Sequence, residues 1–587
     1  MNSNQEPGME SRALLAIVLS MAVLAFYQYY FVPPIDESAQ LPRETGGAAQ
    51  APESAEEDPG AARDAGLSDA VPVPMAADAG ESALPVAALA PETLRIRAEN
   101  YTATVTNLGG RLQAFVLNQY QSAARTPLDL VHPAAAADNE LPFGIETPDD
   151  PTIAAAANNA LYALEARGGT VGGGERTPRP GDPVVVELRW ADGRGSSVFK
   201  RIEFPASGNQ LRVQVEATAP GASAAFLTLG AGLDAVEAGS RNAFLAEGAL
   251  ALVGEEIERW APPEPDPAAG ISGEVRWAGI ESHYFLGAFL FDAPSEVRIS
   301  SRSVSSLDPA AEPQIALPSV AIRVPIDGVL TGVYLGPKKF DFLLQQGYDI
   351  DRAVDFGWMG ILARPLLALL VWIHSFVGNY GVAIILLTVL LRIVFLPLNH
   401  KSMVSMRRMQ RLQPQMASIR AKYKGAKELE KRQKMNEEVM ALYKREGVSP
   451  FGGCLPMLAQ LPILFAFYRL LSVAVELRQA PFVMWVQDLS DYDPYLVLPL
   501  LMGGSMLVQQ RMTPSPGADP MQARMFKFMP VIFTVLFLYV PSGLVLYWLV
   551  NNLLGITQQL YVNRKMDAEL QAEEALPKAK KRQRGKR

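Results

Sequence analysis

The 587-residue chain has one cysteine and four histidines, and this scarcity excludes two kinds of site. Because Cys454 has no second thiol to pair with, no intramolecular disulfide can form. The histidines, His132, His283, His374 and His400, lie far apart in the sequence and show no metal-ligand spacing. We therefore expect no metal and no cofactor, and a fold that burial of apolar surface alone stabilises.

Motifs that signal common enzymes are missing as well. The sequence contains no Walker-type glycine-rich loop with its lysine and no nucleophile elbow. With no metal cluster either, no chemical reaction is evident. We expect a protein that is not an enzyme and has no small-molecule substrate.

Charge is sparse and unevenly distributed. Charged residues make up 19% of the chain and hydrophobic residues 49%, which makes it more apolar than a typical soluble protein of this length. The net charge of -8 hides an asymmetry, because the region before Trp358 is rich in Asp and Glu whereas the chain ends in KAKKRQRGKR. Such sorting is typical of a chain whose parts a membrane separates. We expect a membrane protein with a large soluble part.

The N-terminal region begins with an apolar stretch over residues 12–32 that ends in an aromatic cluster. Pro33 and Pro34 stand where a signal peptidase would need small residues, so we interpret residues 1–34 as an uncleaved transmembrane signal anchor. Residues 35–91 are dominated by Ala, Pro, Glu, Asp and Gly, and are too poor in large apolar residues to form a core. They are expected to be a disordered linker.

A β domain is predicted over residues 92–345. Short alternating runs such as PVVVELRW and LRVQVEATA are separated there by Gly, Pro and Asn turns, which is typical of antiparallel strands. A sandwich is favoured over a barrel, although the pattern alone leaves both open.

Five apolar stretches that suit membrane spans follow, at about 380–398, 455–475, 494–511, 528–541 and 543–561. The segment 358–377 looks like another span, but the parity of crossings excludes it. Loop 399–448 is strongly basic and is therefore expected in the cytoplasm, whereas the acidic β domain lies outside. Only one crossing fits between them, so we expect an interfacial amphipathic helix within 346–379.

The five spans define a helical core over residues 380–563. Within it, loop 399–448 is predicted to form two amphipathic helices, roughly 400–423 and 427–445. Residues 564–587 form a basic tail. Both termini are expected in the cytoplasm.

Arg392 lies in the middle of the apolar run ILLTVLLRIVFLPLNHKS. On an insertion scale, an arginine at the centre of a membrane-spanning helix costs about +2.5 to +3.5 kcal/mol. No Asp or Glu occurs at a comparable depth in any span. An unpaired guanidinium needs water, so we favour a hydrated cavity over buried structural bonding. A cation in such a cavity would attract an acidic or polar segment that passes part-way across the membrane.

Other polar residues recur in the spans. On a helical projection Thr388 falls on the stripe of Arg392, and Tyr547 shares a stripe with Asn551 beside that of Trp548. For the amide and hydroxyl residues, helix-to-helix hydrogen bonding and cavity lining both remain open. The residues predicted to line a hydrophilic groove are Arg392, Thr388, Gln460, Ser505, Gln509 and Asn551.

A second arginine in a span, Arg469, is expected to extend toward the outer surface, in the direction of Glu476. In the tail, the cations Lys580, Lys581, Arg582 and Arg584 suit contacts with anionic lipid or ribosomal RNA. A plain topology signal explains the tail equally well.

Several of these segments together resemble one family. WIHSFVGNYG, the span with the arginine, MALYKREGVSPFGGCLPMLAQLPI, VELRQAPFVMWVQDLSDYDPY and FMPVIFTVLFLYVPSGLVLYW are similar to the YidC family of membrane protein insertases, related to the mitochondrial Oxa and chloroplast Albino proteins. The resemblance covers nearly all of 350–563. The anchor, linker and β domain are similar to the Gram-negative form, whose β domain resembles mutarotase-like supersandwiches.

The resemblance implies a five-helix core with a hydrophilic groove, in which Arg392 supplies the positive charge. It also implies client contacts at Thr388, Tyr547 and Trp548, the last replacing a tyrosine that many members have. The implied activity is insertion, folding and assembly of inner-membrane proteins from the bacterial inner membrane, with the β domain in the periplasm. The implied partners are nascent membrane proteins, the Sec translocon, the ribosome and membrane lipids. A transporter or channel is the alternative, and a carbohydrate enzyme in the β domain is a third hypothesis.

Overall fold

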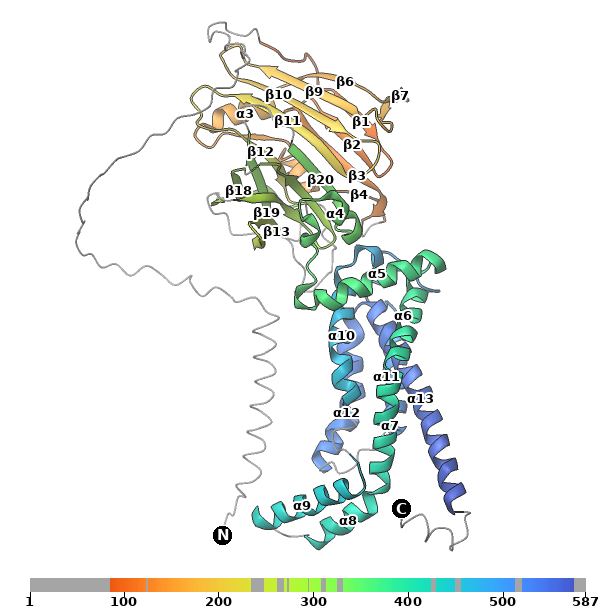
Figure 1. Ribbon diagram of the computed structural model, residues 1–587. Coiled ribbons are helices and arrows are strands. Elements are labelled where there is room, and N and C mark those ends of the chain that lie inside the picture. The colour runs from red at the N-terminus through yellow and green to blue at the C-terminus, as the bar shows by residue number, and fades with distance from the viewer. Residues whose placement is uncertain are drawn as a thin grey trace, which may run out of the picture. The chain divides into compact units, whose positions relative to one another are not determined.

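The computed structural model describes part of the chain, drawn in colour in Figure 1. The described residues are 85–574 except 123–124, 234–247, 261–268, 272–273, 294, 308–312, 325–330, 424–428, 449–454 and 513–519. The predicted anchor, most of the predicted linker and the basic end of the tail lie outside the described residues.

The β domain contains three sheets among the described residues. The strand orders are β4-β3-β2-β1-β8-β7, then β14-β13-β16-β17-β20-β11-β10-β9-β6, and β15-β18-β19-β12-β5. The strands are β1 (Thr93–Arg97), β2 (Tyr101–Thr106), β3 (Arg111–Gln121), β4 (Pro127–Asp129), β5 (Ile145–Glu146), β6 (Ala163–Arg167), β7 (Thr170–Gly172), β8 (Glu175–Thr177), β9 (Val184–Ala191), β10 (Ser197–Phe204), β11 (Gln210–Thr218), β12 (Phe226–Ala231), β13 (Gly248–Val253), β14 (Glu256–Trp260), β15 (Ala269–Ile271), β16 (Val275–Glu281), β17 (Phe285–Leu290), β18 (Val297–Ser305), β19 (Gln314–Arg323) and β20 (Thr331–Pro337).

The predicted antiparallel sandwich is confirmed. The pairings are antiparallel apart from β1 with β8. One continuous apolar core takes side chains from all three sheets, such as Tyr101, Ile202 and Leu227, which is how a sandwich buries its inner faces. In β10 every second residue is buried, so the period of two sends Lys200 inward with Val198 and Ile202.

Three helices accompany the strands: α2 (Pro133–Ala137), α3 (Pro151–Asn159) and α4 (Phe340–Gln346). The first two begin at side-chain caps, since His132 Nδ1 accepts from the Ala134 N–H and Asp150 accepts from the Thr152 N–H. The predicted β domain, 92–345, therefore ends in a helix, because the last strand stops at Pro337.

The remaining described elements are helices. The elements are η1 (Ile350–Ala353), η2 (Gly357–Met359), α5 (Gly360–Val377), α6 (Tyr380–Val394), α7 (Leu396–Arg411), α8 (Gln413–Lys422), α9 (Leu429–Arg445), α10 (Leu455–Val473), η3 (Val475–Leu477), α11 (Val497–Met512), α12 (Pro520–Leu536), η4 (Phe537–Tyr539) and α13 (Ser542–Glu574).

The predicted span 380–398 is a bent pair rather than one straight helix. α6 ends before Phe395, and α7 continues at an angle of 64°. Pro397 explains the break, because it lacks an N–H and its ring conflicts with the carbonyl of Ile393. The span therefore has a built-in bend next to Arg392.

Helix α5 corresponds to the segment 358–377, which the parity of crossings excluded from the membrane spans. Together with η2 it forms the one described helix, Gly357–Val377, that is long and apolar enough to cross a membrane alone, and the α6–α7 pair passes the same test only as a bent span. Figure 1 shows α5 lying across the ends of α6 and α10 instead of alongside them. Trp358 of η2 and Ile361 and Trp372 of α5 are exposed. The interfacial position remains a prediction, and this crossing direction suits it.

Two predicted segments differ from the helices of the structure. The first helix of loop 399–448 is interrupted at Leu412, because Pro414 removes a backbone donor at the start of α8. The last helix does not stop near 563 but continues to Glu574. Contacts with α7 hold this extension, since Arg407 donates to Asp567 at 2.8 Å and Arg411 donates to the Met566 carbonyl at 3.2 Å.

Helices α8 and α9 pack as a hairpin. Met416 and Tyr443 lie in a small buried cluster with Leu442, and the Tyr443 hydroxyl contacts the Met416 sulfur at 3.2 Å. Lys422 and Glu438 form an exposed ion pair across the hairpin at 2.7 Å. The buried methionine therefore belongs to the hairpin's own core.

Candidate functional site

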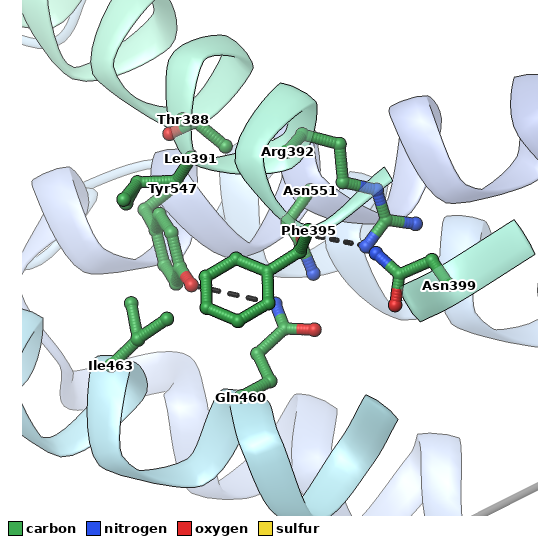
Figure 2. Close-up of a pocket in the computed structure, with 9 residues that line it drawn as sticks. All are labelled: Thr388, Leu391, Arg392, Phe395, Asn399, Gln460, Ile463, Tyr547 and Asn551. Atoms are coloured by element: carbon green, nitrogen blue, oxygen red, sulfur yellow. Dashed lines mark hydrogen bonds between the residues drawn. The ribbon is translucent and has the colours of Figure 1, made fainter. Parts of the chain in front are cut away.

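A small polar cavity lies between α6, α7, α10 and α13. Its volume is about 20 Å³, room for roughly one water molecule. Figure 2 shows the described residues that line it: Thr388, Leu391, Arg392, Phe395, Asn399, Gln460, Ile463, Tyr547 and Asn551. Helix α6 thus carries the threonine and arginine, one turn apart, into the same space as polar groups from three other helices.

Arg392 is only partly satisfied in this cavity. Its Nη1 donates to Asn551 Oδ1 at 3.2 Å, and its Nε is buried without a partner among the described residues. No carboxylate is among the described lining residues. The guanidinium therefore keeps donor capacity that another group can use.

Gly555 makes room for the arginine. A Cβ at Gly555 would lie 2.6 Å from Arg392 Nη2 and 2.9 Å from Gln509 Nε2. Both side chains therefore end against the same stretch of α13 backbone. Gln509 does not line the cavity among the described residues, but it is a close neighbour of the arginine.

The other polar groups of the cavity are tied to their surroundings. The Thr388 hydroxyl donates to the Ile384 carbonyl of its own helix at 2.6 Å. Gln460 Nε2 donates to the Tyr547 hydroxyl at 3.4 Å, which Figure 2 shows as a dashed line. Tyr547 stacks on Phe467 with ring centroids 4.3 Å apart. These contacts hold the wall of the cavity opposite the arginine.

Two further residues predicted for the site do not line the cavity. Ser505 accepts a hydrogen bond from Asn552 Nδ2 at 3.0 Å, which joins α11 to α13. Trp548 packs against Phe533 and Phe537 of α12 and η4, with ring centroids 5.8 and 5.3 Å away. In this conformation they take part in helix packing, and their contact with a client remains a prediction.

Sequence reasoning did not assign the apolar lining, Leu391, Phe395 and Ile463, to the site. Phe395 lies on the bend after α6, so a straight helical projection could not position it. Asn399 falls on the arginine's stripe of the projection, and the structure places it in the lining despite the bend.

The suggested partner of Arg469, Glu476, is wrong. Arg469 Nη2 instead donates to Asp355 Oδ2 at 2.7 Å. Burial alone would raise the pKa of Asp355, but Arg469 and the Gly357 N–H outweigh burial and lower that pKa. Arg469 is therefore committed to a partner, unlike Arg392.

The histidines of the β domain do not form an acid-base site. His132 caps α2, and burial lowers its pKa. Burial, assisted by Lys338, lowers the pKa of His283 to about 3, so this imidazole is neutral at physiological pH. Neither arrangement supports the hypothesis of a carbohydrate enzyme.

Comparison with known proteins gives two family matches that follow each other along the chain. Residues 93–369 match the model described as YidC periplasmic domain, and residues 372–569 match the model described as 60Kd inner membrane protein. The boundary between the matches falls inside α5.

The chain is also similar to individual proteins. A membrane protein insertase YidC of Geobacter metallireducens is 36% identical over 95% of this chain and 99% of its own length. That of Geobacter sulfurreducens is 35% identical over 79% of this chain and 85% of its own length. A crystal structure of an active YidC insertase with its first transmembrane domain resolved is 18% identical, covers 81% of this chain and 94% of that chain, and has a TM-score of 0.35.

Proposed function

The chain belongs to the YidC family of membrane protein insertases, and from this premise we propose that it inserts nascent membrane proteins by means of the Arg392 cavity. The family places the chain in the bacterial inner membrane with a periplasmic β domain. The proposal extends to folding and assembly of the inserted proteins, in the sense of a chaperone. Both termini then lie in the cytoplasm.

The observation that carries the proposal is the unsatisfied arginine beside a polar cavity. Arg392 has one hydrogen bond and a free Nε, and no described carboxylate neutralises it. In surroundings of low dielectric, a client carboxylate near the guanidinium gains more Coulomb energy than it would in water. That gain offsets part of the cost of moving an acidic client end into the membrane.

The volume of the cavity bears on how a client enters. A hydrated groove was expected, but Phe395, Ile463 and the stacked Tyr547 fill most of the space and leave about 20 Å³. A peptide segment does not fit there. We therefore propose that a client separates α10 from α6 and α7, for which Pro462 inside α10 and the 64° bend offer deformable points.

A transporter or channel is less favoured. Either needs a continuous path and, for coupled transport, an acidic group in the spans. The cavity at Arg392 has room for about one water, and no carboxylate is among its described lining residues. Insertion requires neither feature, and it is not an enzymatic reaction.

The Sec translocon and the ribosome are proposed partners. The tail cations Lys580, Lys581, Arg582 and Arg584 would hold a ribosome through phosphate contacts, which salt weakens steeply. Truncation after Pro577 should lower ribosome co-sedimentation at low salt and leave the topology unchanged. Unchanged co-sedimentation across a salt series would leave only the orientation signal.

The direct test is site-specific photocrosslinking during synthesis of a small single-span client. A photoreactive residue at Thr388 should crosslink to the client, whereas one at Leu501, exposed on α11, should not. A probe at Trp548 decides whether clients reach beyond the cavity to the aromatic contact with α12. Equal crosslinking from Thr388 and Leu501 would contradict the proposal.

A further inference from the structure

A second and much larger cavity lies where the start of α7 meets the end of α9. Its volume is about 300 Å³. The described residues that line it are His400, Lys401, Val404, Ser405, Arg408 and Gly447. Lys401, Val404, Ser405 and Arg408 follow the spacing of one helical face, so α7 presents two permanent cations to the same space.

The cations of this cavity have no anionic partner within the described part of the chain. Neither Lys401 nor Arg408 forms an ion pair or side-chain hydrogen bond with a described residue, and no described carboxylate lines the space. The carboxylate next to it in sequence, Glu446, is paired with Arg445 at 3.2 Å. The cavity therefore holds positive charge that the surrounding protein does not neutralise.

Other arginines of the same helix show the contrast. Arg407 is ion-paired with Asp567 at 2.8 Å, and Arg411 donates to the Met566 carbonyl at 3.2 Å. Those two attach α7 to α13. Lys401 and Arg408 are not needed for that packing, so their charges are free to bind a ligand.

The residues that precede the cavity in the sequence indicate how deep in the membrane it lies. Ile393, Val394 and Leu396 expose 60%, 62% and 50% of their surface, as lipid-facing residues would. Lys401 follows Leu396 by five residues, which puts it at most about 7–8 Å further along the membrane normal. A headgroup layer is roughly 5–7 Å thick on each side of the hydrocarbon core. Lys401 therefore lies at headgroup level, and the side chain of Arg408 leans back toward it.

We propose that this cavity binds the phosphate of an anionic phospholipid from the cytoplasmic leaflet. Lys401 and Arg408 would contact the phosphate oxygens, and the Ser405 hydroxyl would donate a further hydrogen bond. The proposal rests on the membrane orientation given above, but not on insertase activity. A bound lipid would tie the α8–α9 hairpin to the membrane surface beside the arginine-bearing span.

The test uses the purified full-length chain in neutral detergent, titrated with dioleoylphosphatidylglycerol and observed by native mass spectrometry. The variant Lys401→Gln/Arg408→Gln should weaken binding about tenfold or more, because each headgroup-level cation contributes several-fold. The matched control Lys434→Gln/Lys444→Gln removes two exposed cations of α9 and should change binding less than about twofold. The charge-preserving Lys401→Arg/Arg408→Lys should retain binding, which separates loss of charge from misfolding.

Four results would overturn the proposal. Equal binding of dioleoylphosphatidylcholine, or equal weakening by both glutamine pairs, would show nonspecific attraction. Full competition by millimolar glycerol 3-phosphate would identify a free phosphate as the ligand. Loss of ribosome co-sedimentation with phosphatidylglycerol binding intact would assign the cations to RNA. Because insertion is not measured, failure here leaves the proposed function untouched.

Discussion

Lys200 in the β domain and Arg392 among the helices are both cations that form no ion pair with a described residue. Lys200 is fully buried, and its Nζ donates to the carbonyls of Gly109, Gly110 and Phe143 at 2.7, 3.1 and 2.7 Å. Arg392 has more donors but makes one hydrogen bond, at 3.2 Å, and leaves Nε without a partner. The more buried cation is thus the better satisfied one.

The difference teaches how to separate a structural charge from a functional one. Around Lys200 the backbone is shaped for the ammonium group, since Gly109 and Gly110 both adopt positive φ and turn their carbonyls toward it. Around Arg392 the polar neighbours leave the guanidinium partly unsatisfied next to a cavity. A charge that the fold does not satisfy is available to a client.

The largest expected effect is a loss of stability when Lys200, the cation with satisfied hydrogen bonds, is replaced. Lys200→Met should lower the free energy of unfolding of the β domain by about 3 kcal/mol, because three buried carbonyls lose their donor. Urea-dependent proteolysis of the purified full-length chain measures this. Arg201→Gln, which removes the neighbouring, partly exposed ion pair with Glu203, should cost under about 1 kcal/mol. Equal effects would remove the distinction between the two cations.

The pH dependence of the same domain sharpens the comparison. Burial, assisted by Arg111, lowers the pKa of Lys200 well below its usual 10.5. Between the folded and unfolded pKa values the unfolded chain binds more protons, so stability should rise with pH, by at most about 1.4 kcal/mol per unit. Below the folded pKa this slope disappears. In the pH range immediately below 10.5 the slope should be smaller in Lys200→Met, and an unchanged slope there would assign it to other groups.

A smaller effect is expected at the glycine beside the unsatisfied cation. Gly555→Ala places a methyl group 2.6 Å from Arg392 Nη2, so the guanidinium must move away from Asn551. Insertion of an acidic client should fall about threefold, a cost near 0.7 kcal/mol. Gly504→Ala is the control, because nothing lies within 4 Å of its added Cβ. Equal insertion by both variants would show that the arginine's position is not critical.

The smallest effect on insertion is expected from removing the β domain, which contains Lys200. Deletion of about 92–330 should change insertion of simple clients by less than about twofold, because the Arg392 cavity is built from α6, α7, α10 and α13 alone. Insertion into proteoliposomes measures it. Loss of insertion from a deletion whose helices remain folded would give the β domain more than an accessory role.

The sequence predicted the features that depend on local period and composition. Alternating runs such as that of β10 marked the β domain, and the apolar stretches marked α6, α10, α11, α12 and α13. Within the site, Thr388 and Arg392 share one helix and Tyr547 and Asn551 share another, so helical spacing was enough to pair them.

Other features depend on tertiary contacts that no local pattern reports. The extension of α13 to Glu574 is held by Arg407 and Arg411, which lie more than 150 residues away in sequence. The partner of Arg469 is Asp355, which lies in a segment before α5. A helical projection of the span that contains Arg469 does not include that segment. The small volume of the cavity depends on how Phe395 is placed after the bend.

The most direct test of the central claim, that Arg392 offers charge to a client, uses two versions of one client in proteoliposomes. Their translocated segments differ only in having two aspartates or two asparagines, and protease protection measures insertion. Arg392→Ala should lower insertion of the aspartate client about tenfold and affect the asparagine client much less, whereas Arg392→Lys should retain most insertion of both. Equal loss of insertion in Arg392→Ala and Arg392→Lys, or equal loss for both clients, would show that Arg392 makes a fixed structural bond. Either result would contradict the account.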